Sequence, residues 1–117
     1  MTWFSGFEYL LRAEKSEKIS FDYDGVLSTD QGKSLARRKV TEGYKVYIIT
    51  ARHPDETVFN TARDLGIYKS RVYFTSGAPK WKTIKALGIN KHYDNNANVV
   101  EEINRLTDCE AVLVEFK

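Results

Sequence analysis

One short stretch, residues 19–27, constrains the fold of this 117-residue chain more than any other. Its sequence is Ile-Ser-Phe-Asp-Tyr-Asp-Gly-Val-Leu, in which bulky apolar residues alternate with polar ones, and this alternation predicts a strand. Because successive side chains of a strand point to opposite faces, we expect Asp22 and Asp24 to point the same way. Gly25 permits a sharp turn after them. The stretch therefore predicts a pair of acids at the carboxyl end of a strand, where open α/β sheets bind ligands.

A pair of neighbouring carboxylates permits phosphoryl-transfer chemistry. One carboxylate can attack a phosphoryl group and form an aspartyl-phosphate. The second can protonate the leaving oxygen and then activate a water molecule. Two adjacent negative charges also attract a hard cation such as Mg²⁺. The alternative is a solvated Asp-x-Asp-Gly turn, since such tetrapeptides are common, and the rest of the chain must decide between the two.

The composition is that of a single globular domain spanning residues 1–117. Hydrophobic residues make up 42% of the chain and charged residues 29%, which fits a soluble protein. The formal net charge of +2 is too small to indicate a nucleic-acid or membrane partner by itself. Cys109 is the only cysteine, so no internal disulfide can form. Neither a membrane span nor a secretory signal is expected, and we predict a cytoplasmic protein.

Strand patterns alternate with helix patterns along the whole chain. We expect strands at 19–23, 44–50, 72–74, 91–94 and 111–116, and helices at about 30–41, 54–65, 80–87 and 97–106. This alternation predicts a three-layer α/β sandwich, in which a five-stranded parallel sheet carries helices on both faces. The strand that carries Asp22 should be central, flanked by the strands at 46–49 and 91–94. Polar residues that follow different strands would then meet at one edge of the sheet.

The N-terminal segment, residues 1–17, has apolar residues at helical spacing. We expect an amphipathic helix that leads into the domain and packs on it. The alternative is a docking segment for a protein partner, or a connection to a larger parent chain. The apolar residues are Trp3, Phe4, Phe7, Leu10 and Leu11.

Four stretches, in this order, resemble the motifs of the haloacid dehalogenase superfamily of phosphohydrolases. Residues 22–26 (Asp-Tyr-Asp-Gly-Val) resemble the first motif, Asp-x-Asp-Gly-Thr/Val. Residues 48–50 (Ile-Ile-Thr) resemble the second, an apolar strand that ends in Thr or Ser. Lys80 resembles the third, and residues 93–95 (Tyr-Asp-Asn) resemble the fourth. The similarity covers residues 18–116, nearly the whole chain.

This resemblance implies a role for each matched residue. Asp22 would be the nucleophile and Asp24 the general acid and base. Lys80 would neutralise Asp22 and the charge on the transferring group, with Lys82 as the second choice for that role. Phosphoryl oxygens would be held by Thr50, Ala51 and Arg52.

The resemblance also implies a Mg²⁺ cofactor, bound between the Asp22 carboxylate, the Asp24 carbonyl and Asp94. The fourth motif of the family usually supplies two acids, whereas Asn95 follows Asp94 here. An amide oxygen can bind Mg²⁺ directly or through water, but it brings no charge. We therefore include Asn95 in the predicted metal site and expect weak metal affinity.

The family inserts its cap domains after the first motif or after the third strand, and neither place has room here. The resemblance thus implies a small capless member with an open site, suited to a nucleotide, a nucleic-acid end or a phosphoprotein. The expected function is a Mg²⁺-dependent phosphatase acting through an aspartyl-phosphate on Asp22. The alternative is a catalytically weak or inactive domain that serves binding or assembly, since Asn95 replaces a usual acid. A phosphoacceptor receiver domain fits less well, because its acid pair precedes the phosphoacceptor strand, and a dehalogenase has no need of Asp24.

Overall fold

Five parallel strands form one central sheet in the order β3-β2-β1-β4-β5. The structure is a computed structural model that describes residues 14–116. The strands are β1 (Lys18–Phe21), β2 (Lys45–Thr50), β3 (Val72–Phe74), β4 (Lys91–Asp94) and β5 (Glu110–Leu113). The prediction of a parallel five-stranded sheet with the Asp22 strand in the middle is therefore confirmed, and β2 and β4 flank β1 as expected.

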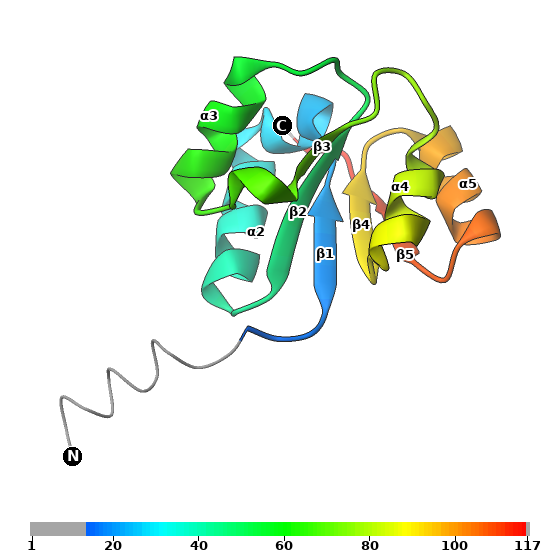
Figure 1. The fold of residues 1–117 in the computed structure, drawn as a ribbon, viewed down its shortest axis with the longest axis horizontal. Helices are drawn as coiled ribbons and strands as arrows, with labels where there is room; N and C mark the ends of the chain where they lie inside the picture. The colour runs from blue at the N-terminus through cyan, green and yellow to red at the C-terminus, as the bar shows by residue number, and fades with distance from the viewer. Residues whose placement is uncertain (1–13, 117) are drawn as a thin grey trace, which may run out of the picture.

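Helices cover both faces of this sheet, as Figure 1 shows. They are α2 (Asp30–Thr41), α3 (Glu56–Leu65), α4 (Lys80–Leu87) and α5 (Ala97–Leu106), with a five-residue turn at Tyr23–Leu27 and a short 3-10 turn at Lys69–Arg71. The pair α2 and α3 packs on one face, and the pair α4 and α5 packs on the other. Each face has its own apolar core, one including Phe21 and Ile48 and the other including Ile49 and Ile103. The three-layer α/β sandwich is thus confirmed.

Polar N-caps fix where three of the helices begin. Thr29 Oγ1 accepts a hydrogen bond from Gly32 N–H, and Asp55 Oδ1 accepts one from Thr57 N–H. Such a side-chain oxygen satisfies a backbone donor that lacks a partner within the helix. Asn96 caps α5 in the same way. Sequence analysis placed the second helix two residues too early, because Pro54 lies before this cap and not in the first helical turn.

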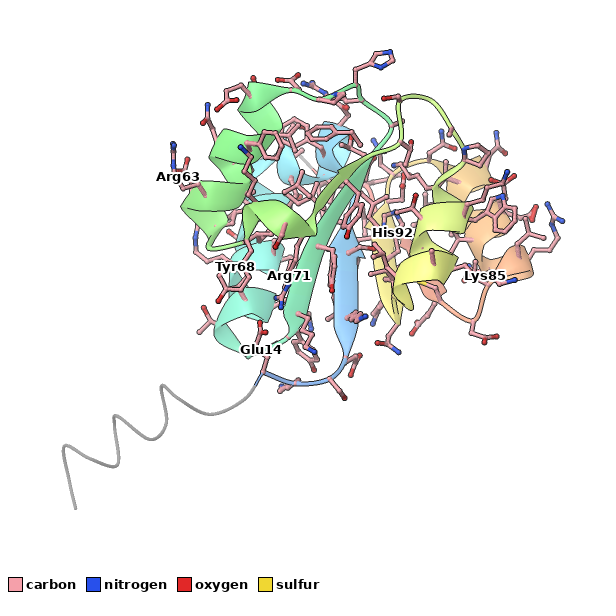
Figure 2. All side chains as sticks on the ribbon, viewed as in Figure 1. Glu14, Arg63, Tyr68, Arg71, Lys85 and His92 are labelled. Carbon is pink, nitrogen blue, oxygen red and sulfur yellow. The ribbon has the colours of Figure 1, made fainter. Side chains whose placement is uncertain are left out.

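The structure also differs from the prediction near both ends of the chain. The last strand ends at Leu113 rather than at residue 116. Residues 14–17 are not helical, and Glu14 instead forms a two-point ion pair with Arg71, with both N–O distances at 2.9 Å. Figure 2 shows this pair at the amino end of the sheet. The remainder of the predicted N-terminal helix lies outside the described residues.

Candidate active site

The two acids that follow β1 differ in burial and in their partners. The strand ends at Phe21, and the backbone enters a tight turn in which Gly25 has a φ of +80°. Asp22 is buried, and its Oδ1 accepts a hydrogen bond from Tyr23 N–H at 2.8 Å. The Asp24 side chain, in contrast, is 57% exposed. The two carboxylates therefore differ in burial, because the strand ends at Phe21 and Asp24 lies in the turn that follows.

A buried ion cluster joins three of the predicted site residues at the carboxyl end of the sheet. Lys80 is the first residue of α4, and its Nζ lies 2.8 Å from Asp22 Oδ1 and 2.8 Å from Asp94 Oδ2. All three side chains are buried. Lys82 is exposed, and its Nζ lies beside the ring of Trp81. The structure thus places Lys80, and not Lys82, against the predicted nucleophile.

Burial and charge set the ionisation of this cluster. Burial raises the pKa of Asp22 to about 6, although the ammonium group of Lys80 acts to lower it. Burial also acts to raise the pKa of Asp94, but the hydrogen bond from His92 and the charge of Lys80 outweigh it and lower that pKa to about 2. At neutral pH two carboxylates therefore share one ammonium group, with one net negative charge.

A second group of polar atoms meets on the other side of the Asp22 carboxylate. One terminal atom of the Asn95 amide lies 3.2 Å from Asp22 Oδ2 and 3.3 Å from the Asp24 carbonyl oxygen. In the orientation that satisfies its neighbours this atom is the amide nitrogen, which donates to both oxygens. Turned by 180°, the amide would instead bring a third oxygen to this place, as the ligands of a hard cation require. The Asn95 amide also packs on Gly25, where a Cβ atom would collide with it.

This arrangement fits a Mg²⁺ ion only as a mixed set of oxygen ligands. Within residues 14–116, no group of three or more His, Cys, Asp or Glu side chains could hold a metal. A cation here would therefore depend on the Asp24 carbonyl and the Asn95 amide as well as on the Asp22 carboxylate. Asp94 lies on the Lys80 side, where its Oδ1 accepts from Asn96 N–H at 3.0 Å.

Of the predicted phosphate-binding residues, Arg52 is the most firmly held. Its Nε and Nη2 donate to the Asp24 carboxylate, and its Nη1 donates to Asp55 Oδ2 at 2.6 Å. The guanidinium group also lies 4.9 Å from the ring centroid of Tyr23. Thr50 is buried at the end of β2, where its Oγ1 accepts from Arg52 N–H at 3.3 Å. In this structure Arg52 thus faces carboxylates rather than open space.

The third predicted phosphate-binding residue, Ala51, is exposed beside the loop that precedes α4. Its carbonyl oxygen accepts from Gly77 N–H at 2.9 Å, and the carbonyl of Arg52 accepts from Ser76 N–H at 3.2 Å. Ser76 has a φ of +51°, which is uncommon for a residue other than glycine. The loop after β2 is therefore tied to the loop after β3.

Sequence analysis missed two fully buried polar residues beneath the cluster, Ser20 and His92. His92 Nε2 lies 2.9 Å from Asp94 Oδ2, and His92 Nδ1 lies 2.6 Å from Ser20 Oγ. Burial lowers the pKa of His92, against the opposing effect of Asp94. Each residue stands two positions before an acid, so the same period-two alternation that predicted the strands could have placed both on the site face.

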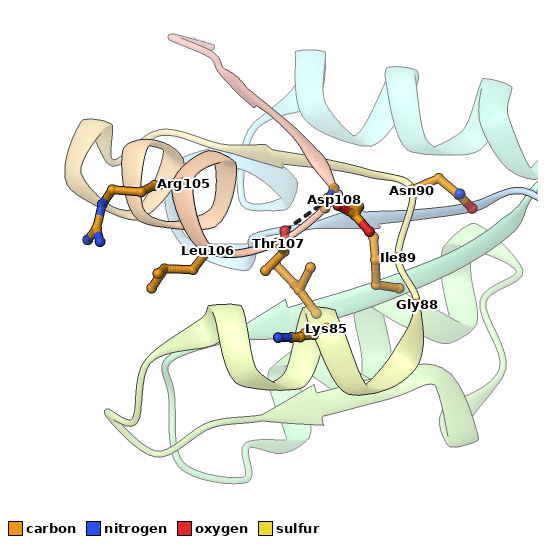
Figure 3. Close-up of a pocket in the computed structure, with 10 residues that line it drawn as sticks. Lys85, Gly88, Ile89, Asn90, Arg105, Leu106, Thr107 and Asp108 are labelled. Carbon is orange, nitrogen blue, oxygen red and sulfur yellow. Dashed lines mark hydrogen bonds between the residues drawn. The ribbon is translucent and has the colours of Figure 1, made fainter.

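The hollow in Figure 3 is distinct from this cluster. It has a volume of about 470 Å³ and lies between the C-terminal ends of α4 and α5, with Lys85 and Arg105 in its lining. Asn90 and Cys109, which also line it, immediately precede β4 and β5, so it lies at the amino ends of the strands. Burial raises the pKa of the Cys109 thiol to about 12, which makes it a poor nucleophile.

Comparisons with known proteins support the fold. No protein-family profile and no curated protein sequence matches this chain. Among solved structures, a candidate 3-deoxy-D-manno-octulosonate 8-phosphate phosphatase from Vibrio cholerae is similar, with a TM-score of 0.52 and 16% sequence identity. The similarity covers 86% of this chain and 75% of that chain. At this identity it is the architecture that is shared: the chain has a haloacid dehalogenase-like fold.

Proposed function

We propose that this chain is a phosphatase that hydrolyses phosphomonoesters through a covalent intermediate on Asp22. The observation that carries the proposal is the placement of Asp22 at the end of the central strand, 2.8 Å from Lys80. A carboxylate can attack phosphorus, and a fixed ammonium group stabilises the charge on the transferring phosphoryl group. The similar structure described as a candidate phosphatase agrees with this proposal at the level of fold.

The proposed reaction has two steps. First, an Asp22 carboxylate oxygen bonds to phosphorus while the bond to the leaving oxygen breaks, and the protonated Asp24 carboxyl group gives its proton to that oxygen. Second, the Asp24 carboxylate takes a proton from water while the water oxygen bonds to phosphorus. The bond between phosphorus and Asp22 then breaks and releases inorganic phosphate. Asp24 must leave Arg52 to do this, and its exposed position permits the movement.

Mg²⁺ is the cofactor that we propose for this site. The Asp22 carboxylate, the Asp24 carbonyl and the Asn95 amide oxygen would hold it, and Asp94 lies next to them across Lys80. When bound, the ion offsets the repulsion between the Asp22 carboxylate and an incoming phosphate dianion. We propose that Thr50, buried at the end of β2, and the backbone of Ala51 bind the phosphoryl oxygens.

We further propose that the domain has no cap and takes a large or nucleotide-type substrate. Only short connections join β1 to α2 and β3 to α4, the two places where a cap would be inserted. An open site favours an exposed phosphate, such as that of a nucleotide, a nucleic-acid end or a phosphoprotein. No helix in residues 14–116 is long and apolar enough to cross a membrane. A cytoplasmic location and a partner for the N-terminal aromatic segment remain predictions.

One observation favours the alternative of a binding domain with weak or no catalysis. If the Asn95 amide nitrogen faces Asp22 Oδ2 and the Asp24 carbonyl, its two hydrogen bonds occupy the place where a cation would bind. A site closed in this way would bind a phosphorylated ligand through Thr50 and Lys80 without turning it over.

Hydrolysis of an aryl phosphate by the full chain tests the proposal. We expect turnover with Mg²⁺, little turnover with EDTA, and none with Asp22→Asn, since a carboxamide cannot form the acyl-phosphate. Acid quenching should retain ³²P on the parent protein and not on Asp22→Asn, and release of this label by hydroxylamine or at alkaline pH would identify the acyl-phosphate intermediate. Equal turnover of the parent and Asp22→Asn would contradict covalent catalysis.

A further inference from the structure

We infer that His92, anchored by Ser20, is a positioning residue for Asp94. Through Asp94 it holds Lys80 in place against Asp22. The inference rests on the proposed function for its catalytic consequence, and it stands on a buried chain of hydrogen bonds for its geometry. Figure 2 shows His92 in the layer between the sheet and α4.

The chain of contacts runs without a break from the middle of the sheet to the candidate nucleophile. Ser20 and His92 are direct neighbours in the register of β1 and β4, and their side chains meet at 2.6 Å. His92 then contacts Asp94 Oδ2 at 2.9 Å. The same oxygen lies 2.8 Å from Lys80 Nζ, which lies 2.8 Å from Asp22 Oδ1.

The partners of the imidazole ring fix its tautomer. Asp94 Oδ2 is a carboxylate oxygen that can only accept, so the hydrogen atom must be on Nε2 of His92. Nδ1 of the neutral ring is then an acceptor, and the hydroxyl group of Ser20 must donate to it. Each polar atom of the two side chains is thus satisfied, although both side chains are 0% exposed.

Two buried polar side chains at these positions need a reason, because apolar residues pack there at lower cost. Burial of a polar group is unfavourable unless every hydrogen bond is made. Other residues on this face of the sheet, Tyr47 and Ile49 of β2 and Ala111 of β5, form an apolar core. The arrangement of Ser20 and His92 is explained if its role is to orient the Asp94 carboxylate.

The orientation of Asp94 matters because its Oδ2 also forms the ion pair with Lys80. A carboxylate rotated about its Cβ–Cγ bond would move this oxygen away from the Lys80 ammonium group, which would then be held by Asp22 alone. His92 donates from the side of the sheet, and Asn96 N–H donates to Oδ1 at 3.0 Å. These two donors together fix the carboxylate plane, as supporting residues do around a catalytic group.

Nitrogen NMR of the histidines tests the geometry without any need for activity. The chain has only two histidines, and His53 is exposed, so it serves as an internal reference. We expect His92 to carry its hydrogen on Nε2 and to accept on Nδ1. A ring with its hydrogen on Nδ1, or on both nitrogens, would overturn the inference.

Variants then test whether the chain positions Lys80. His92→Leu removes the donor to Asp94, while His92→Gln keeps an amide N–H in a position close to that of Nε2. Ser20→Ala removes the anchor, and Ile103→Val, in the same apolar core, is the control for a loss of packing. We expect the ammonium resonance of Lys80 to shift in His92→Leu and Ser20→Ala and to stay in place in Ile103→Val.

Kinetics separate a positioning role from a structural one. We expect kcat to fall about tenfold in His92→Leu, the ratio that corresponds to about 1.4 kcal/mol, with little change in KM and with substantial recovery in His92→Gln. The kcat of Ser20→Ala should also decrease. This variant provides the test if His92→Leu does not fold. If the variants lose only thermal stability, as Ile103→Val does, the inference is overturned. If the parent has no activity while the Lys80 resonance responds as expected, the proposed function fails and the positioning geometry stands.

Discussion

Arg52 holds Asp24 through two nitrogen atoms. Its Nε lies 3.0 Å from Asp24 Oδ2, and its Nη2 lies 2.8 Å from Asp24 Oδ1. The proposed acid and base is therefore engaged by a cation, and a substrate phosphate would compete with Asp24 for that cation. Under the proposed function, phosphate binding to Arg52 would therefore be coupled to release of Asp24.

Replacement of Asp24 by Asn tests the role of the acid. We expect the kcat for aryl phosphate hydrolysis to fall by about 100-fold or more, the usual contribution of a positioned acid or base. Stability should change little, because the side chain is 57% exposed and exposed ion pairs contribute about 0–1 kcal/mol. Steady-state kinetics and thermal unfolding measure the two effects separately.

Asp55→Asn is the matched control for that variant. It removes the charge of the other carboxylate that contacts Arg52, and an Asn at this position can still cap α3, because Asn is as good an N-cap as Asp. We expect only a small change in kcat. Equal losses in Asp24→Asn and Asp55→Asn would mean that the orientation of Arg52, and not a proton on Asp24, limits the rate.

Lys80 and Lys82, both in α4, offer a matched pair of variants. Lys80→Met leaves the Asp22 and Asp94 carboxylates buried without their shared cation, and removal of one partner from a buried ion cluster costs about 3–5 kcal/mol. Activity should be lost as well. Lys82→Met removes the same charge from an exposed position and should leave both properties near those of the parent. Urea unfolding and initial rates measure both, and a strong effect of Lys82→Met would contradict the assignment of Lys80.

The sheet and the buried half of the site could be predicted because they follow from simple periodicities. Alternation of strands and helices predicted the parallel sheet, and the need to bring Thr50 and Asp94 beside Asp22 placed β2 and β4 next to β1. The rule that ligand sites lie at carboxyl strand ends brought Lys80 and Asp94 to Asp22. The exposure of Asp24 could not be predicted, because it depends on a turn that ends the strand at Phe21.

The contacts between loops could not be predicted from the sequence, for a different reason. The ion pair of Arg52 with Asp24 joins loops that follow two different strands, and no local pattern specifies it. The contact between Ser20 and His92 depends on the register of β1 against β4. Periodicity places each residue on the correct face, but only the structure shows that the two are neighbours.

Asp22 should make the metal-free protein less stable at neutral pH than in acid. Its pKa is raised to about 6 from 3.8, so between these values the folded protein holds a proton that the unfolded chain has released. This contribution to stability is complete below about pH 4 and is lost as pH rises to about 6. His92 has a lowered pKa and gives the opposite slope below pH 6.5, so the parent alone does not isolate the effect.

A comparison with Asp22→Asn does isolate it. In EDTA at pH 7.5 we expect the variant to be more stable than the parent, by on the order of 3 kcal/mol from a shift of about two pKa units. At pH 4 the two proteins should be nearly equal. Urea unfolding at both pH values gives the difference, and a less stable variant at pH 7.5 would mean that the attraction of Lys80 outweighs the burial of Asp22.

We expect Asn95 to determine how strongly the site binds a cation. Its amide lies 3.2 Å from Asp22 Oδ2 and 3.3 Å from the Asp24 carbonyl, so a carboxylate at this position would add a charged oxygen to the same place. Mg²⁺ affinity depends on the number of charged oxygen ligands and on their geometry. We therefore expect weak binding by the parent and activity that keeps rising at Mg²⁺ concentrations that would saturate a full set of acids.

Asn95→Asp should tighten Mg²⁺ binding by more than about tenfold, since about 1.4 kcal/mol suffices for that ratio and a close charge contributes on the order of several kcal/mol at an effective dielectric near 20. Asn98→Asp is the control, because it adds the same charge at an exposed position in the first turn of α5. Calorimetric titration of the parent and both variants separates the outcomes.

An equal gain in Mg²⁺ affinity in both variants would indicate long-range attraction rather than a ligand. A gain in Asn98→Asp alone would make residue 98 the ligand and leave Asn95 as a donor to Asp22. No binding to any of the three would favour the binding domain without catalysis, in which the Asn95 amide nitrogen already satisfies both oxygens.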